Sequence, residues 1–307
     1  MKIAIAIALL LTMPIVPVEA QPADNDLSDA LQSAEEWANE NLDSDALQVL
    51  QQIDRDRARK LLEAVSKQFE APNVADLAEI QPAVRAVLPL LESYKETLPY
   101  ALWLKTRLDY FEEAQRSRKT PKQPDKGKPP SPRAQENPTA GAEREIWIRK
   151  LQKRPWPKGS EAYVKALKPI FAQQKVPPQL IWIAEVESSF DPRARSPVGA
   201  AGLFQLMPDT AKRYGLRVGL FDQRFKPASS AEAAAKYLHY LHTRFKDWRL
   251  ALAAYNSGEG TVSKLLAKRK IKTFDAISPQ LPAETQMFVP KVEGTILRRE
   301  GVKLAEL

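Results

Sequence analysis

The 307-residue sequence contains no cysteine, which excludes a disulfide framework and thiolate metal sites. It also excludes a lipid-modified N-terminal cysteine, so we expect a soluble mature protein and not a lipoprotein. Histidine is scarce too: His239 and His242 are the only two, and no H-E-x-x-H pattern is present. Their i,i+3 spacing places both on one helix face. Nothing else supports a metal site or a Ser-His-Asp triad, and we expect no metal and no cofactor.

Long apolar runs are missing everywhere except at the N-terminus. There, Lys2 precedes the apolar run Ile3–Leu11, and Val18-Glu19-Ala20 offers a small-residue cleavage site. The run is short for a membrane span. Residues 1–20 therefore predict a signal peptide and export, to the periplasm of a Gram-negative cell. An uncleaved N-terminal anchor is the alternative.

Acidic residues are outnumbered by basic ones, 38 to 46, which gives a formal net charge of +8. A basic exported protein is attracted to polyanions such as a membrane surface, nucleic acid or the carboxylate-bearing cell wall. The basic residues are dispersed and no nucleic-acid motif occurs. We therefore expect no nucleic-acid partner and a weak attraction to the wall or membrane surface. The sequence identifies no protein partner.

Glycine is nearly absent from residues 21–115, where apolar residues recur at helical spacing. This pattern predicts a helical N-terminal region, which the prolines divide into short helices. A docking module is one interpretation, and we favour a helical hairpin packed on the C-terminal part. Residues 116–142 are rich in proline and lysine and predict a linker. The prolines that divide the N-terminal region are Pro72, Pro82, Pro89 and Pro99.

Alternating β patterns of convincing length are also missing, and residues 143–307 read as helices. We expect a mainly α, lysozyme-like α+β domain with one short β-hairpin around Gly199–Leu206, where Gly199 and Gly202 permit unusual backbone angles. The Pro177-Pro178 pair predicts the start of a helix that ends near Ser189. Further helices are predicted at 209–214, 229–246, 248–254, 259–268 and 284–298.

The predicted helix before Ser189 carries two glutamates in the sequence IAEVESSFDP. Glu185 and Glu187 are about 200° apart around a helix, so they face opposite sides and cannot act as a pair. Glu187 lies near the helix C-terminus, where the helix dipole disfavours negative charge. With partial burial, its pKa should rise, as a carboxylic general acid requires. From spacing alone, a surface glutamate is the commoner case.

Three motifs beyond this helix identify a family. The segments VESSFDPRARSPVGAAGLFQLMPDTAKRYGL, LALAAYNSGEG and LPAETQMFVPKV together resemble the soluble-lytic-transglycosylase (SLT) domain of goose-type lysozyme fold. The resemblance covers about residues 160–298, so residues 143–307 are the expected SLT domain. It implies a single catalytic acid/base, which falls on Glu187. The implied glycan-binding residues are Ser188, Gln205, Met207, Tyr255 and Asn256. Glu185 matches no catalytic position, so we expect a surface or salt-bridging residue.

One position departs from the family pattern. Related enzymes carry a tyrosine in an E-T-x-x-Y-V segment, and this sequence has Phe288 instead. If the tyrosine hydroxyl positions the catalytic carboxylate, Glu187 is held less tightly here. Tyr255 is the candidate substitute.

The resemblance implies an enzyme of cell-wall organisation that cleaves peptidoglycan strands without water and forms 1,6-anhydro-N-acetylmuramic acid ends. A hydrolytic muramidase of the same fold is one alternative, and a non-catalytic wall-binding or scaffold protein is another. The intact Glu187-Ser188 pair and the AYNSG motif argue against the scaffold. Because the linker separates the two parts, we expect residues 143–307 to fold and act alone.

Overall fold

Helices make up almost all the regular structure in the computed structural model, which describes residues 69–92, 98–119 and 137–307. The mainly α prediction is confirmed. In chain order the longer elements are α5 (Leu77–Glu92), α6 (Leu98–Lys119), α7 (Ala140–Leu151), α8 (Ser160–Gln173), α9 (Ile183–Ser188), α10 (Pro208–Arg213), α11 (Pro227–Phe245), α12 (Trp248–Ser257), α13 (Glu259–Ala267), α14 (Phe274–Ile277) and α15 (Ala283–Glu300). Short 3₁₀ turns are η1 (Val74–Asp76), η2 (Pro178–Trp182), η3 (Gln223–Phe225), η4 (Ser278–Gln280) and η5 (Leu304–Glu306).

The predicted C-terminal helices correspond to α10, α11, α12, α13 and α15, with ends that differ by three residues at most. The helix expected after Pro177-Pro178 begins with η2 and continues as α9. The expected hairpin is reduced to two isolated antiparallel bridges, Arg195 with Ala201 and Ala201 with Leu206. The sequence analysis missed α14, which at four residues is too short to show a helical period.

Proline proved a poorer guide to helix ends. We expected Pro82 and Pro89 to end helices, but α5 runs through both. Pro169 and Pro290 likewise lie inside α8 and α15. A proline inside a helix removes one backbone hydrogen bond. Packing of the apolar helix face supplies most helix stability in proteins, so it outweighs that loss.

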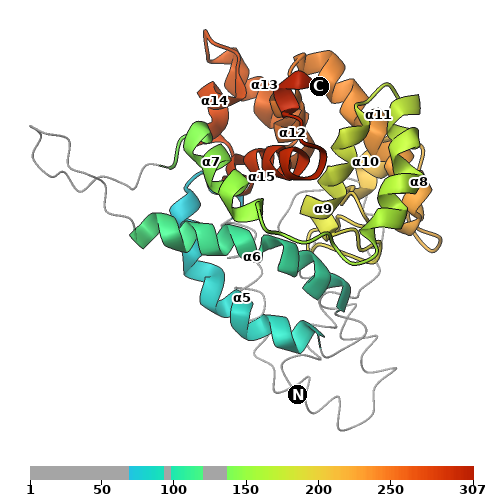
Figure 1. The fold of residues 1–307 in the computed structure, drawn as a ribbon, viewed down its shortest axis with the longest axis horizontal. Helices are drawn as coiled ribbons and strands as arrows, with labels where there is room; N and C mark the ends of the chain where they lie inside the picture. Colours follow the sequence, from blue (N-terminus) through green and yellow to red (C-terminus); the bar gives the residue numbers. More distant parts are fainter. Residues whose placement is uncertain (1–68, 93–97, 120–136) are drawn as a thin grey trace, which may run out of the picture.

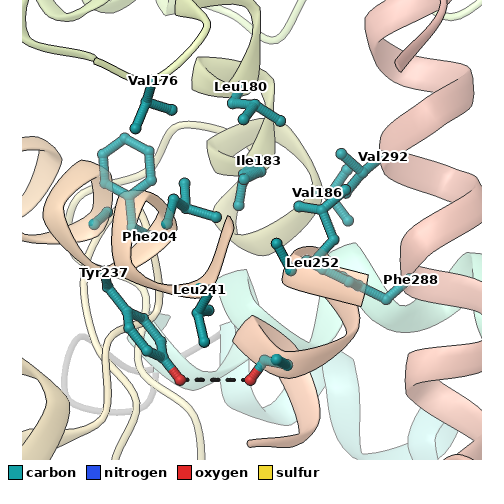
Figure 2. Packing of buried hydrophobic residues seen from close by; sticks show 14 of the residues in the cluster. Val176, Leu180, Ile183, Val186, Phe204, Tyr237, Leu241, Leu252, Phe288 and Val292 are labelled. Carbon is teal, nitrogen blue, oxygen red and sulfur yellow. Dashed lines mark hydrogen bonds between the residues drawn. The ribbon is translucent and has the colours of Figure 1, made fainter. Parts of the chain in front are cut away.

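The main core surrounds α9. Ile183 and Val186 of α9 pack with Leu252 of α12 and with Phe288 and Val292 of α15, all fully buried or nearly so. Figure 2 shows these side chains between the helices, with the Tyr237 hydroxyl donating to the Ala254 carbonyl at 3.4 Å. A helix as short as α9 has little stability of its own, so this apolar packing holds it in place.

The N-terminal helices α5 and α6 share a second core with the C-terminal part. Phe111 of α6 is fully buried, and the Tyr110 and Trp147 rings make an edge contact at 5.6 Å. The same cluster includes Ala283 and Met287 of α15. Figure 1 shows α6 lying between α5 and α9. The favoured interpretation of this region, a helical hairpin packed on the C-terminal part, agrees with this arrangement.

Both ends of the predicted linker, residues 116–142, are helical in the structure. Helix α6 continues to Lys119 and α7 begins at Ala140. Residues 120–136 lie outside the described part, as do 1–68, and the signal peptide, the linker and the domain limits stay predictions. Among the described helices, none combines the length and the apolar character that crossing a membrane requires.

Candidate active site

The two glutamates of α9 are both buried, with Glu185 5% exposed and Glu187 3% exposed. Helix α9 ends because Ser189 adopts the left-handed conformation, with φ 51°. The Ser189 amide then donates to the Glu185 carbonyl at 3.0 Å. This ending confirms that Glu187 lies in the last turn, and the half-turn spacing directs the two carboxylates to different partners.

Glu185 binds Arg299 of α15 through both carboxylate oxygens, at 2.9 Å and 2.7 Å. Arg299 also donates to the backbone carbonyls of Arg154 and Pro155, at 3.0 Å and 2.7 Å. Of the two expected alternatives, a surface or a salt-bridging residue, the structure shows the salt bridge, and the pair is buried. The bidentate pair satisfies both buried charges, so Glu185 has a structural role.

Glu187 binds Arg107 of α6, with its Oε2 at 2.7 Å from Nη2. Arg107 Nη1 donates to the backbone carbonyl of Glu187 at 2.5 Å. The Arg107 Nε donates to Glu284 Oε1 of α15 at 3.1 Å. Oε1 of Glu187 accepts no hydrogen bond from any residue that the structure describes. The carboxyl group is therefore fixed at one oxygen, and the other has no partner among the described residues.

Burial raises the pKa of Glu187 to about 7, against the attraction of Arg107. The nearby Glu284 carboxylate raises that pKa further, and Lys291 lowers it. Lys291 is itself buried, which lowers its pKa to about 8. A carboxyl group with a pKa near 7 exists in both protonation states at neutral pH, as acid and base catalysis require.

The end of α9 and the loop that follows it carry two further predicted residues, Ser188 and Gln205. The Ser188 hydroxyl donates to the carbonyls of Ala184 and Leu203, at 3.1 Å and 2.8 Å, and so ties α9 to this loop. Gln205 has φ 47° and donates to the Ala194 carbonyl at 3.1 Å, while its own buried Oε1 has no partner. Gly202, with φ 80°, is required there, because a Cβ would lie 2.0 Å from the Arg224 carbonyl oxygen.

The other predicted residues lie at the ends of α10 and α12. Met207 precedes α10 and is 43% exposed. The Tyr255 hydroxyl donates to the Phe204 carbonyl at 2.7 Å, and burial raises its pKa well above 10. Asn256 Oδ1 accepts a hydrogen bond from the Thr285 hydroxyl at 2.6 Å. Tyr255 donates to a backbone carbonyl and not to Glu187, so it does not take the place of the missing phenol.

Phe288 is fully buried in the main core, beside Val186 and Leu252 (Figure 2). Arg107 binds both the side chain and the backbone carbonyl of Glu187, so this chain holds the carboxyl group without a phenol at position 288. The sequence analysis missed Arg107. It lies 80 residues upstream of Glu187, in a segment that the motifs do not cover.

In the described part of the chain, no cluster of three or more histidine, cysteine, aspartate or glutamate side chains is arranged to hold a metal ion. The two histidines differ in surroundings. His242 stacks on Trp248 with 3.9 Å between ring centroids, and His239 is exposed on the same helix. His242 thus packs against a ring and His239 faces solvent.

Comparison with known proteins agrees with the motifs. The family model described as "Transglycosylase SLT domain" matches residues 169–278, which include Glu187 and all five predicted glycan-binding residues. Arg107 and Glu284 lie outside that match.

Two curated proteins and one solved structure are similar to this chain. Membrane-bound lytic murein transglycosylase D of Escherichia coli K12 is 40% identical over 124 residues, which are 39% of this chain and 27% of that protein. The chain thus spans about a quarter of that relative. A putative tributyltin chloride resistance protein of Alteromonas sp. M-1 is 32% identical over 145 residues, which are 46% of this chain and 70% of that protein. The structure of an inactive mutant of lytic transglycosylase Slt from Pseudomonas aeruginosa aligns with a TM-score of 0.41 and 19% identity, over 90% of this chain and 46% of that one. The domain match and these relatives show that the chain belongs to the transglycosylase SLT domain family.

Proposed function

We propose that this protein is a peptidoglycan lytic transglycosylase that cleaves the β-1,4 bond between N-acetylmuramic acid and N-acetylglucosamine without water. The proposal depends mainly on one observation. Glu187 lies in the last turn of a buried helix of the SLT domain, with a pKa raised to about 7 and with one carboxylate oxygen unpaired among the described residues. A group of this kind can donate a proton and later accept one.

In the proposed reaction Glu187 first acts as the acid. It protonates the glycosidic oxygen, the bond from that oxygen to muramic C1 breaks, and N-acetylglucosamine leaves with a new hydroxyl. The substrate's own N-acetyl group stabilises the positive charge at C1. Glu187, now a carboxylate, takes the proton from the muramic C6 hydroxyl as that oxygen bonds to C1. The 1,6-anhydro ring closes, Glu187 is protonated again, and no water is consumed.

The surroundings of Glu187 support a mechanism with one carboxylate. Two-carboxylate glycosidases need a second free carboxylate across the scissile bond. Glu185 faces away from Glu187 and has both oxygens on Arg299. Glu284 is bound to Arg107 on the same guanidinium that holds Glu187. Glu185 thus has no free oxygen, and Glu284 shares the guanidinium that holds Glu187, so we assign neither as a second catalytic carboxylate and take the C6 hydroxyl as the attacking group.

The proposed glycan contacts fall into two kinds. Met207 is partly exposed and offers an apolar contact for a sugar ring, while the buried amide oxygen of Gln205 has no partner among the described residues. A sugar hydroxyl could pair with this oxygen only if the Gln205 side chain turns toward the glycan. Ser188 and Tyr255 donate to backbone carbonyls of the loop 203–204, so we assign them to holding that loop beside Glu187. Asn256 is linked to Thr285 at the other end of the site.

We place this activity outside the cytoplasm, in the periplasm, after cleavage of the predicted signal peptide. The net charge of +8 would draw the enzyme toward the carboxylates of the wall. The substrate would be the glycan strands themselves, without a metal or cofactor.

Digestion of purified peptidoglycan tests the proposal. Residues 21–307 are compared with the Glu187→Gln variant and with Glu185→Gln as the matched control, and the products are read by mass spectrometry. We expect muropeptides lighter by one water from the wild type and the control, and none from Glu187→Gln. Products with reducing ends would indicate a muramidase instead. Binding to the wall without Glu187-dependent products would indicate a scaffold.

A further inference from the structure

We infer that Arg107, which lies outside the SLT match, is a positioning residue that fixes the catalytic carboxyl of Glu187 while sharing its charge with Glu284. This inference rests on the proposed function and extends the active site into helix α6 of the N-terminal region. No motif in the sequence marks Arg107 for such a role.

The guanidinium of Arg107 holds Glu187 at two places. Nη2 donates to the side-chain Oε2 at 2.7 Å, and Nη1 donates to the backbone carbonyl at 2.5 Å. The carbonyls of the last helical turn have no partner within the helix, so an outside donor is needed there. One planar group thus fixes both the end of α9 and the rotamer of the carboxyl group that α9 carries.

Arg107 is itself held rigidly. It is 4% exposed, and its guanidinium lies 4.9 Å from the centroid of the Trp103 ring. Lys291 fixes helix α6 on both sides of Arg107. Its Nζ donates to the Thr106 carbonyl at 2.7 Å and lies 3.6 Å from Asp109. The Tyr110 and Phe111 side chains are buried in the shared core. These contacts hold helix α6 in place beside Glu187. Precise positioning of a catalytic group requires a rigid support of this kind.

Glu284 opposes the effect of Arg107 on the pKa of Glu187. An arginine paired with a single carboxylate stabilises the ionised form and would hinder proton donation. Here the guanidinium serves two carboxylates, Glu187 through Nη2 and Glu284 through Nε. The second negative charge opposes the ionisation of Glu187. Positioning and acidity can thus be set by different members of the same cluster.

Five titratable groups act on Glu187 or are acted on by it. Arg107 and Tyr110 come from α6, Glu284 and Lys291 from α15, and Tyr255 from α12. Arg107 and Lys291 lower the pKa of Glu187, and Glu284 raises it. Because Arg107 and Glu284 act with opposite signs, substituting each in turn should move the pH dependence in opposite directions. A purely structural role predicts no such pattern.

The experiment measures kcat/KM on purified peptidoglycan from pH 5 to 9 for Arg107→Met, Glu284→Gln and Arg299→Met. The last variant breaks the other buried arginine–glutamate pair of α9 and is the matched control. The pKa of Glu187 is followed independently by ¹³C NMR of the labelled carboxyl group. This second readout does not require activity.

We expect the basic limb of the Arg107→Met profile to move up by about one pH unit, and that of Glu284→Gln to move down by about one. At pH 5.5, where Glu187 is protonated in each variant, Arg107→Met should still lose at least about tenfold in kcat, because the carboxyl is no longer fixed. Arg299→Met should keep the wild-type limb and, per folded molecule, its activity.

Limbs that do not move, or that move equally in Arg299→Met, would overturn the inference. If Arg107→Met does not fold, Arg107→Lys replaces it. Lysine keeps the charge but cannot bind the carbonyl and both carboxylates together, so kcat should fall while the limb stays in place. In that case the inference would be overturned if Arg107→Lys kept the wild-type kcat and the basic limb of the Glu284→Gln pH profile stayed in place. A wild type without anhydro products would overturn the proposed function instead, and the NMR titration would still decide whether Arg107 acts on Glu187.

Discussion

The two faces of helix α9 carry the same pair of residue types and use them differently. On one face both oxygens of Glu185 bind Arg299, whose other hydrogen bonds among the described residues go to backbone carbonyls. On the other face Glu187 gives one oxygen to Arg107, which also binds Glu284. The first arginine serves one carboxylate and the second serves two.

This difference shows that burial alone does not mark a catalytic carboxylate. Glu185 and Glu187 are almost equally inaccessible, at 5% and 3%. Glu185 has both oxygens on Arg299 and so offers none to a substrate. Glu187 has one oxygen without a partner among the described residues and a pKa raised to about 7, which is the arrangement expected of a group with a chemical role.

Removing α6 should have the largest effect on this comparison, because it deletes the partner of Glu187 and leaves that of Glu185 in place. The linker led us to expect an independent 143–307 fragment. The structure changes that expectation, since the fragment would lack Arg107 and would expose the core around Trp147 and Met287. We now expect it to be insoluble, or folded with activity reduced at least about a hundredfold.

The matched control is a 69–307 fragment, which keeps α5 and α6. It should match the activity of residues 21–307 in the same peptidoglycan digestion. Solubility and circular dichroism separate loss of folding from loss of catalysis. A soluble 143–307 fragment with full activity would show that α6 is not part of the site.

Replacing each glutamate by glutamine should shift stability in opposite directions. Glu185→Gln leaves Arg299 buried without its carboxylate and should lose about 3 kcal/mol in the free energy of unfolding. Glu187→Gln should gain up to about 3 kcal/mol at pH 8, because burial raises the pKa of Glu187 from 4.5 to about 7. Urea denaturation at several pH values measures both.

The pH dependence of the free energy of unfolding explains why Glu187→Gln should be more stable than the wild type at pH 8. Between pH 4.5 and about 7 the folded protein binds a proton on Glu187 that the unfolded chain has released. The wild type therefore loses stability as pH rises through that window, and glutamine, which does not titrate, avoids the loss. The advantage of Glu187→Gln should shrink to under about 1 kcal/mol at pH 5 and vanish near pH 4. A constant difference at all pH values would mean that ionisation of Glu187 is not its cause.

The sequence alone predicted much of the SLT part. The period of apolar residues located α10 to α13 and α15, and half-turn spacing separated Glu185 from Glu187. The last-turn position of Glu187 was predicted correctly, whereas its pKa is raised chiefly by burial and by Glu284, which tertiary packing supplies. Apart from that pKa, these features depend on residues close together in the chain, for which local physics is sufficient.

Contacts between distant segments could not be predicted in the same way. Arg107 is one of 46 basic residues, and nothing near it in the sequence distinguishes it from the others. Its position is fixed by the packing of α6 in the shared core, where Tyr110 contacts Trp147 and Phe111 contacts Phe69. The prolines of α5 failed as markers for a related reason, because tertiary packing decided the helix and not local preference.

The smallest effect is expected from Phe288→Tyr, which restores the hydroxyl of the family pattern. Phe288 is fully buried, so a hydroxyl without a partner would cost about 1–3 kcal/mol and lower the melting temperature by several degrees. Residues 284 and 288 lie one turn apart on α15, so the hydroxyl would enter from the face that carries Glu284.

The effect of Phe288→Tyr on catalysis should also be small. Because Arg107 already fixes the carboxyl, kcat should change less than about threefold. A tenfold rise would show that Arg107 positions Glu187 incompletely. Measuring the same substitution in an Arg107→Lys background sharpens the comparison, since there a hydroxyl that reaches Glu187 should recover part of the lost rate.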